Sequence, residues 1–351
     1  MPRRNWTQIE ILSRYVVFAL PLVIGLTGCA ISQRNSQLEA NGTGSRQAEL
    51  LGLLEACRRQ HAADLSPESL AGLMRDAGDV RRFAEQQRQR RERMRRAMET
   101  YNRGVCLIHG AFTLIEERDG RLQPVEDADG QPFEFEYLGS GFLVDDRGCV
   151  LTNRHVAEPW WNNDAVAPLI ARDLVPEFTR LTATFPGNAP KDVDPETIRT
   201  SRDGVDLAMF VVTLDAVPVL PLFEGDARDL RGQGVMLLGY PTGLSALLAR
   251  AEPEVAEEAM NAAADTASLI RELSTRNGIA PLATHGTLND VTDGKLIYDA
   301  VTTTGGSGGP VFGPDGTVIG VNFAMMRGFQ GSNFGVPIRF ARPLLNQLTD
   351  K

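Results

Sequence analysis

A serine flanked by glycines is the feature of this sequence with the clearest chemical meaning. Ser307 lies within Gly305-Gly306-Ser307-Gly308-Gly309, and strand-like apolar segments precede and follow this run. Because glycine has no Cβ, the backbone here can approach a ligand closely, and its N–H groups can stabilise an oxyanion. A flexible Gly-Ser linker is the alternative, but a linker would not be flanked by strand patterns on both sides. The run therefore favours a nucleophilic serine.

A serine hydroxyl is a weak nucleophile until a general base accepts its proton and a third group orients that base. The sequence contains four histidines, at positions His61, His109, His155 and His285. None of them follows Ser307, which excludes the order serine, acid, histidine of the α/β-hydrolases, although the turn matches their G-x-S-x-G elbow. His109 and His285 lie in apolar runs without an evident partner, so we expect structural roles for them.

Two residues upstream of the serine can complete the chemistry. His155 ends a strand–turn–strand pattern over residues 139–157, and Asp206 begins the apolar segment 206–212. For the histidine, the alternative is a buried structural imidazole. For the carboxylate, the alternative is a turn or capping role, and Asp203 is a nearby competitor.

The three segments resemble, in order and in local sequence, the trypsin-like (chymotrypsin-fold) serine peptidases, and most of all their bacterial HtrA-type branch. Those proteins read G-S-G-F…L-T-N-x-H-V, then D-L-A, then G-x-S-G-G-P, and the resemblance covers about residues 103–345. It implies that Ser307 is the nucleophile and that His155 is the general base and then the acid. It also implies that Asp206 orients the imidazole. The N–H groups of Gly305 and Ser307 would form the oxyanion hole, worth about 3 kcal/mol per donor.

The resemblance further implies a substrate pocket. The residue six before the serine, Val301, would form part of the base of the S1 pocket and could not attract a Lys or Arg side chain. We therefore expect an exported serine endopeptidase that cleaves protein substrates after small or medium apolar residues. The segment Asn322-Phe323-Ala324 would line the rim of the pocket and pair with the substrate backbone. The sequence has no H-E-x-x-H motif or cysteine pair with ligand spacing, so we expect no metal and no cofactor.

The pattern of the chain from Gly104 onward is mainly β. A first set of short strands is predicted near 105–116, 135–144, 149–154, 180–185, 206–213 and 217–223. A second set is predicted near 234–240, 282–289, 295–301, 309–313, 317–324 and 332–338. Six plus six strands fit two barrels better than βαβ units, and the resemblance implies a double six-stranded β-barrel of chymotrypsin type. The peptidase domain would span 104–351, with barrels over about 104–225 and 232–340.

Two segments depart from a minimal peptidase. Residues 158–200 include Trp160 and Trp161, which would either line the substrate cleft or pack in the core. Residues 244–278 predict a helical insertion, because apolar residues recur there at steps of three and four. A closing helix is expected near 339–348, and the sequence beyond it is too short for the PDZ module that HtrA-type peptidases usually carry.

The start of the sequence resembles a bacterial lipoprotein signal. Three arginines precede the apolar run 15–26, which is shorter than the roughly 20 residues of a spanning helix. The run leads into Leu26-Thr27-Gly28-Cys29, so we predict a signal peptide over residues 1–28 and lipidation of Cys29. A plain membrane anchor or a secretory signal is the alternative. The prediction places the protein in the bacterial envelope, facing the periplasm, and Ala30 after the cysteine favours the outer membrane.

A flexible tether is predicted over residues 29–46 and a helical region over 47–103. The helix near 79–101 holds eight Arg and two Glu between positions 81 and 96, in a sequence whose net charge is −9. It would be a solvated helix, a surface for anionic lipid or an acidic partner, or a coiled coil that sets a homo-oligomer. The 244–278 insertion is a second candidate oligomer contact. The acidic net charge argues against nucleic-acid binding.

The remaining cysteines leave one question open. Beyond Cys29 the sequence contains Cys57, Cys106 and Cys149. Export permits a disulfide, and Cys106 and Cys149 fall on predicted strands of one barrel, so a bond between them is a hypothesis. For the whole protein, a catalytically latent peptidase-like scaffold and an esterase remain alternatives to the endopeptidase.

Overall fold

The computed structural model describes residues 67–118, 120–127, 129–202, 204–214, 216–325 and 332–347, together with the single residue Gly52. The predicted signal peptide, the tether and Cys29 lie outside the described residues, as do His61, Cys57 and Asp203. The chain divides into two compact units, Met1–Arg88 and Gln89–Lys351. No helix within the described ranges has the length and apolar composition needed to cross a membrane.

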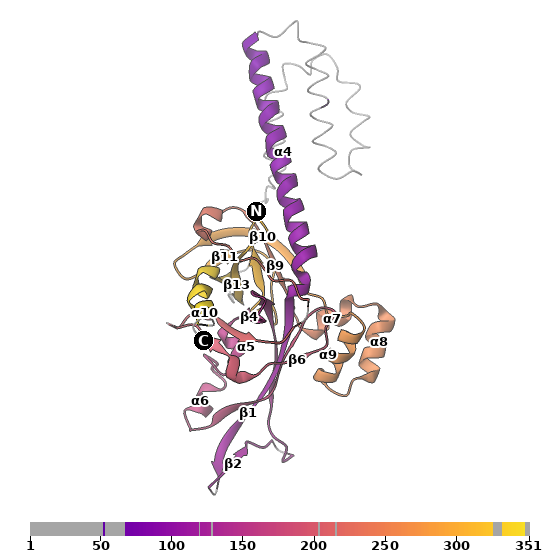
Figure 1. Cartoon of the computed structure of the whole chain (residues 1–351), viewed down its shortest axis with the longest axis vertical. Coiled ribbons are helices and arrows are strands. Elements are labelled where there is room, and N and C mark those ends of the chain that lie inside the picture. Colours follow the sequence, from indigo (N-terminus) through magenta and orange to yellow (C-terminus); the bar gives the residue numbers. More distant parts are fainter. Residues whose placement is uncertain are drawn as a thin grey trace, which may run out of the picture. The chain divides into compact units, whose positions relative to one another are not determined.

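Helix α4 (Pro67–Tyr101) begins in the first unit and ends in the second (Figure 1). Proline at its first position fits a helix start, because the missing N–H would have no partner there. In the first unit the helix carries ion pairs three residues apart, Arg82 with Asp79 and Arg88 with Glu85. Such exposed pairs contribute little stability. The helix confirms the predicted helical region before the β domain.

In the second unit, the last turns of α4 pack on β-structure. Met94 and Ala97 are buried, and the ring of Tyr101 stacks on Phe312 with centroids 6.1 Å apart. Apolar side chains four and three residues apart share one face of a helix. This face of α4 therefore contributes to the core of the second unit.

The first set of strands forms one antiparallel sheet. Its eight strands are β1 (Val105–Arg118), β2 (Arg121–Pro124), β3 (Phe135–Leu143), β4 (Cys149–Thr152), β5 (Val175–Thr184), β6 (Lys191–Asp192), β7 (Arg199–Thr200) and β8 (Ala208–Val211). They follow the order β6-β5-β1-β3-β4-β8-β7, and β2 pairs with β1. The two described end strands, β6 and β7, do not pair with each other, so this sheet is open rather than a closed six-stranded barrel. The strand number is larger than predicted because three short strands are added: β2 pairs with β1, β6 with β5, and β7 with β8.

The second set of strands closes into a barrel in the order β10-β11-β14-β13-β12-β9. Its strands are β9 (Gly234–Gly239), β10 (Leu282–Val291), β11 (Leu296–Tyr298), β12 (Pro310–Phe312), β13 (Val318–Met325) and β14 (Asn333–Pro337). Apolar side chains from alternate positions fill it, among them Val235, Leu237, Leu288, Val311 and Ile319. The mainly β fold class with two β units is confirmed.

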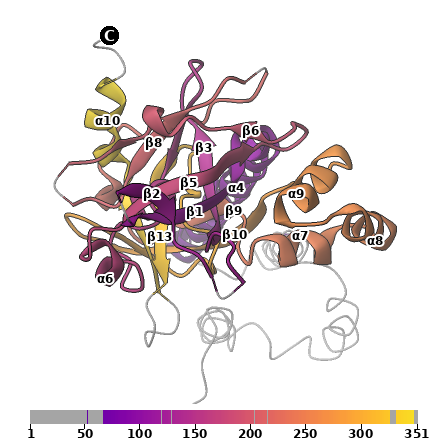
Figure 2. The same cartoon turned by 90° about the horizontal axis from the view of Figure 1, so that it is seen from below.

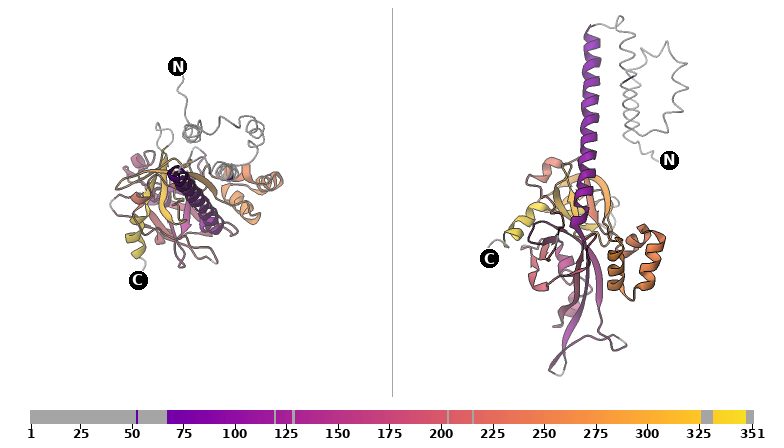
Figure 3. Two further views of the ribbon diagram at one scale, coloured as in Figure 1. Left: turned by 90° about the horizontal axis from the view of Figure 1, so that it is seen from above. Right: turned by 45° about the vertical axis from the view of Figure 1, so that its right-hand side comes forward.

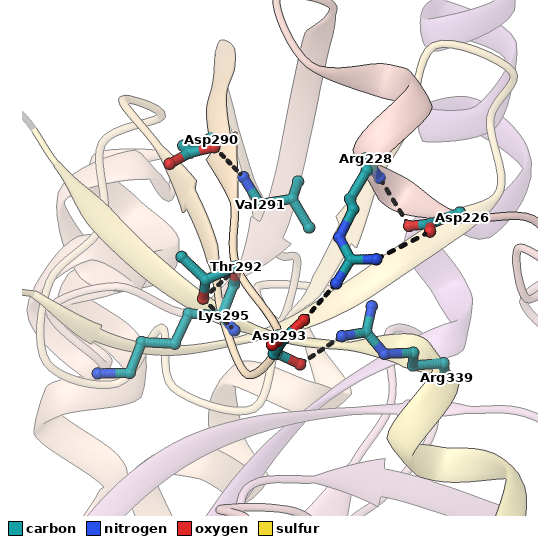
Figure 4. Close-up of polar contacts among 8 residues, drawn as sticks. All are labelled: Asp226, Arg228, Asp290, Val291, Thr292, Asp293, Lys295 and Arg339. Atoms are coloured by element: carbon teal, nitrogen blue, oxygen red, sulfur yellow. Dashed lines mark hydrogen bonds and ion pairs between the residues drawn. The ribbon is translucent and has the colours of Figure 1, made fainter.

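A polar network fixes the turn between β10 and β11 on the surface of this barrel (Figure 4). Thr292 and Lys295 close the turn through three hydrogen bonds, one of 2.9 Å between main-chain atoms. Arg228 forms ion pairs with Asp226 and Asp293. The network joins the turn to the short helix η4 (Ala227–Leu230), which precedes β9.

Several predicted boundaries change in the structure, and two of them matter for chemistry. Strand β4 stops at Thr152, and the next residues form the short helix α5 (Arg154–Ala157), so His155 is helical rather than at the end of a strand. Strand β8 begins at Ala208, so Asp206 lies in the loop before it. The predicted strand 217–223 is wrong: only an isolated bridge at Leu222 forms there.

The predicted helical insertion is confirmed. It contains α7 (Leu244–Arg250), α8 (Pro253–Ala262) and α9 (Thr266–Thr275) between β9 and β10, and these helices lie together beside the sheet (Figures 2 and 3). Asp265 and Ser268 form a capping box at the start of α9. The remaining short helices are η2 (Asn102–Gly104), α6 (Ala167–Ile170), η3 (Pro195–Thr197), η5 (Ile338–Ala341) and α10 (Arg342–Asn346).

Two smaller questions from the sequence are answered by packing. Trp160 packs between Phe112 and Phe178, with ring centroids 5.4 and 4.9 Å away, so it belongs to the core. The hypothesised disulfide is absent: Cys106 and Cys149 are both free and buried. Burial raises the pKa of Cys149 to about 12 and that of Cys106 further, so neither thiol ionises near neutral pH.

Candidate active site

The structure brings two of the predicted catalytic residues into direct contact. The Nδ1 atom of His155 lies 2.7 Å from Oδ2 of Asp206, and the main-chain N–H of His155 donates to Oδ1 of the same carboxylate at 3.0 Å. The carboxylate is mostly buried, whereas the imidazole is 35% exposed. The carboxylate thus fixes the ring through both of its oxygens. It favours the tautomer with the proton on Nδ1, which leaves Nε2 able to accept a proton.

Asn153 holds this pair in place. It is fully buried, and its Nδ2 donates to the main-chain oxygen of Asp206 at 2.9 Å. Its own main-chain oxygen accepts the N–H of Ala157 and so begins α5. The polar residue between strand β4 and helix α5 therefore joins the histidine segment to the aspartate loop.

The serine lies in a tightly packed loop between β11 and β12. Gly305 and Gly308 adopt φ of +91° and +88°, where other residues are strained. A Cβ on Gly308 would lie 1.9 Å from the oxygen of Ser140, and a Cβ on Gly305 would lie 2.5 Å from the oxygen of Tyr240. The glycines are thus needed both for conformation and for close approach.

The hydroxyl of Ser307 donates to the main-chain oxygen of Phe323 at 3.4 Å. It makes no hydrogen bond to His155 in the described part of the chain. Catalytic hydrogen bonds are often long or absent before substrate binds. Among residues 67–347 as far as they are described, the N–H groups of Gly305 and Ser307 have no hydrogen-bond partner, so both are free to bind an oxyanion.

Ser140 connects the serine loop to both β units. Its N–H donates to the oxygen of Ser307 at 2.8 Å, and its Oγ donates to the oxygen of Gly305 at 2.7 Å. The N–H of Tyr240, at the end of β9, donates to the same Oγ, and Thr152 Oγ1 donates to the oxygen of Ser140. Sequence reasoning did not assign this residue a role, although it stands in the G-S-G-F motif.

The predicted pocket residues lie in different environments. Val301 is 67% exposed, and Phe323 is half-buried with its ring 6.2 Å from that of Phe334. Asn322 is only 1% exposed, and its side-chain amide hydrogen-bonds within the loop. Ala324 lies on β13, and its side chain is outside the described atoms.

The two histidines for which structural roles were expected lie in different environments. His285 is exposed on β10. His109 is buried, and its Nε2 lies 2.7 Å from Oε1 of Glu136, whose Oε2 accepts a hydrogen bond from Thr266 in α9. The burial of His109 agrees with the structural role expected for it, and its partner, which was not evident from the sequence, lies 27 positions away on the neighbouring strand.

Known proteins with similar sequences are serine proteases. The family described as "Trypsin-like peptidase domain" matches residues 139–321. The chain is 30% identical over 237 residues to the "Probable periplasmic serine endoprotease DegP-like" of Halomonas elongata, covering 66% of this chain and 40% of that protein. It is also 30% identical over 223 residues to the protein of the same name from Hahella chejuensis, covering 62% and 37%. The chain thus spans about two fifths of the length of these curated relatives.

Among solved structures, the serine endoprotease from Yersinia pestis is similar with a TM-score of 0.44 and 18% identity, over 73% of this chain and 66% of that chain.

The range 139–321 matched by the family is just over half of this sequence and contains the segments of His155, Asp206 and Ser307. The chain therefore belongs to the trypsin-like peptidase domain family.

Proposed function

We propose that this protein is a serine endopeptidase that hydrolyses peptide bonds of protein substrates. The observation that carries the proposal is the pairing of His155 with Asp206 through two hydrogen bonds of 2.7 and 3.0 Å. Support also comes from the free main-chain N–H groups of Gly305 and Ser307 and from relatives named serine endoproteases.

The mechanism follows from these groups. Ser307 Oγ attacks the carbonyl carbon of the scissile bond while Nε2 of His155 accepts the hydroxyl proton. The carbonyl π electrons move to the oxygen, which the N–H groups of Gly305 and Ser307 stabilise. The imidazolium, stabilised by Asp206, gives its proton to the leaving amine as the C–N bond breaks. A water molecule, deprotonated by the same imidazole, then attacks the acyl carbon, and the imidazolium returns the proton to Oγ of Ser307 as the ester C–O bond breaks.

The substrate preference follows from the predicted pocket. Val301 offers no carboxylate for a basic side chain, so cleavage after small or medium apolar residues is expected. The backbone of β13 next to Phe323 would add the substrate as a strand. A peptide-library profile dominated by Lys or Arg at the cleaved position would contradict this preference.

The proposed location is the bacterial envelope, with the protein facing the periplasm. Relatives named periplasmic support the compartment, and the lipoprotein-like segment before Cys29 supports a lipid anchor, with the outer membrane favoured by Ala30. A homo-oligomer would form through helix 79–101 or the 244–278 insertion. Globomycin-sensitive processing and mass spectrometry of the mature N-terminus test the anchor.

A catalytically latent scaffold is the second candidate, because the hydroxyl of Ser307 is directed to Phe323 rather than to His155. A fluorophosphonate probe and casein hydrolysis separate the candidates. The endopeptidase predicts stoichiometric labelling of Ser307 and casein cleavage, both lost in Ser307→Ala. If neither labelling nor cleavage is observed, the result supports the scaffold. Labelling together with ester hydrolysis but without peptide cleavage would indicate an esterase.

A further inference from the structure

The two N–H groups of the proposed oxyanion hole belong to separate peptide planes. The N–H of Gly305 belongs to the Thr304–Gly305 peptide, and the N–H of Ser307 belongs to the Gly306–Ser307 peptide. The peptide bonds of the described residues are trans, so the C=O and the N–H of each plane point in opposite directions. A group that holds the carbonyl therefore also sets the direction of the N–H.

Each of these carbonyls has a hydrogen-bond donor. The main-chain N–H of Thr242 donates to the oxygen of Thr304 at 2.7 Å. The side-chain Nδ2 of Asn322 donates to the oxygen of Gly306 at 2.8 Å, and the main-chain N–H of Gly309 donates to the same oxygen at 3.2 Å. Of these three donors, Asn322 makes the shorter bond to the plane that carries the N–H of Ser307, and as a side chain it can be changed by mutation.

The Asn322 amide is itself held from several sides. The hydroxyl of Tyr298 donates to its Oδ1 at 2.6 Å, and its Nδ2 also lies 3.3 Å from Oγ1 of Thr302. Because the carbonyl of Gly306 can only accept, the atom that faces it is the amide nitrogen. The main chain of Asn322 also pairs with Gly308 and Gly309, which directly follow Ser307.

We propose that Asn322 is a positioning residue of the oxyanion hole. Its buried amide holds the carbonyl of Gly306 so that the N–H of Ser307 points to the place where the oxyanion forms. This inference rests on the proposed function. It assigns Asn322 an inward role in place of the pocket rim, because its polar side-chain atoms are already bonded within the loop.

Loss of the Asn322 bond would leave the carbonyl of Gly306 held only by the longer bond from the N–H of Gly309. Glycine at position 306 permits many backbone conformations, and only the hydrogen bonds to the loop select one of them. Removing an oxyanion donor outright costs about 100- to 1000-fold in kcat, and misdirecting a donor costs less. Asn322→Ala is therefore expected to lower kcat by about 10- to 100-fold with KM within about twofold.

The experiment measures kcat and KM for an apolar peptide substrate together with the inhibition constant of a matching peptide boronate. The boronate forms a tetrahedral adduct at the serine, so its affinity reports the oxyanion hole. For Asn322→Ala its affinity is expected to fall in parallel with kcat. A role in folding alone would lower the active fraction and the melting temperature but would leave the affinity of the active molecules unchanged.

Asn322→Asp provides a readout that depends on pH. A carboxylate cannot donate to the carbonyl of Gly306, whereas the neutral acid can, and burial favours the neutral acid. The activity of this variant relative to the native protein at the same pH is expected to rise as the pH falls. Burial keeps the pKa of Tyr298 well above its usual value, so its hydroxyl remains a donor throughout.

Asn333→Asp is the matched control. Asn333 is 6% exposed on β14 of the same barrel, and its Nδ2 donates at 2.6 Å to the oxygen of Ala300, which belongs to neither peptide plane of the proposed oxyanion hole. This variant is expected to lose thermal stability without the parallel fall in boronate affinity or the recovery at low pH. If Asn322→Ala does not fold, Tyr298→Phe removes the bond that orients the amide and is expected to lower kcat by about 3- to 10-fold.

The outcomes separate the inference from the function on which it rests. An active native protein whose foldable Asn322 and Tyr298 variants keep kcat and boronate affinity would overturn the inference alone. A native protein that neither cleaves the peptide nor binds the boronate would overturn the proposed function and the inference with it.

Discussion

The open sheet and the closed barrel contribute to the candidate site in different ways. The sheet supplies His155 and Asp206, whose side chains contact each other directly, at 2.7 Å. The barrel supplies a glycine loop whose carbonyls are held by Thr242, Ser140 and Asn322. The sheet half therefore depends on side-chain chemistry, and the barrel half depends on backbone direction. This difference predicts different consequences for mutations in the two halves.

The largest effect is expected where the two halves meet. Ser307→Ala and His155→Ala should each lower kcat by about 10⁴- to 10⁶-fold, and the double variant should be no worse, because the residues act as a unit. Single-turnover hydrolysis of a peptide substrate measures this. Additive losses in the double variant would show that the hydroxyl and the imidazole do not act together.

The next effect tests the side-chain half alone. Asp206→Asn keeps the size of the side chain but favours the wrong imidazole tautomer, so kcat should fall by about 10⁴-fold. The melting temperature should change little compared with this loss of activity, because the side-chain oxygen of the amide can still accept the N–H of His155. Activity within tenfold of the native value would remove the role assigned to this carboxylate.

The backbone half is tested by two matched glycine substitutions. Gly308→Ala places a Cβ 1.9 Å from the oxygen of Ser140 at φ of +88°, so kcat should fall by about 100-fold or more. Gly187→Ala has a similar φ of +74° with no atom within 4 Å. It should cost only about 1 kcal/mol of stability and no activity. Equal effects of the two changes on kcat would contradict a geometric role for the loop.

The smallest effect concerns packing in the sheet. Cys106 and Cys149 are buried thiols with raised pKa, so neither should react with iodoacetamide at pH 8 until the protein is unfolded in urea. Removing the reductant should shift the melting temperature by less than about 1 °C, since no disulfide forms. Rapid alkylation of the native protein, followed by mass spectrometry, would show that the sheet opens more readily than its packing indicates.

Local sequence patterns predict much of this architecture. The alternation after Gly104 predicts the β class, and the three- and four-residue spacing in 244–278 predicts helices, which the structure contains as α7 to α9. The same patterns did not predict every boundary of the helices and strands. Helix α5 could not be foreseen, because the turn after Thr152 is set by Asn153 contacting the Asp206 loop, more than 50 positions away.

The candidate site likewise combines residues that the sequence predicts with contacts that it does not predict. Residue types, their order and the resemblance to trypsin-like peptidases singled out His155, Asp206 and Ser307, and the range matched by the family includes all three. The partners of Ser140, His109 and Asn322 could not be predicted, since an isolated polar residue in a strand pattern gives no sign of what it will bond.

The amino-acid sequence by itself determined the family, the β class and the helical insertion, because each depends on residue type, order and local periodicity. Only the tertiary structure decided which buried polar atoms hold the serine loop. The hydroxyl of Ser140 and the oxygen of Gly305 are 165 positions apart in the chain. Folding places them 2.7 Å apart because the sheet and the barrel must both satisfy their buried polar groups where they meet.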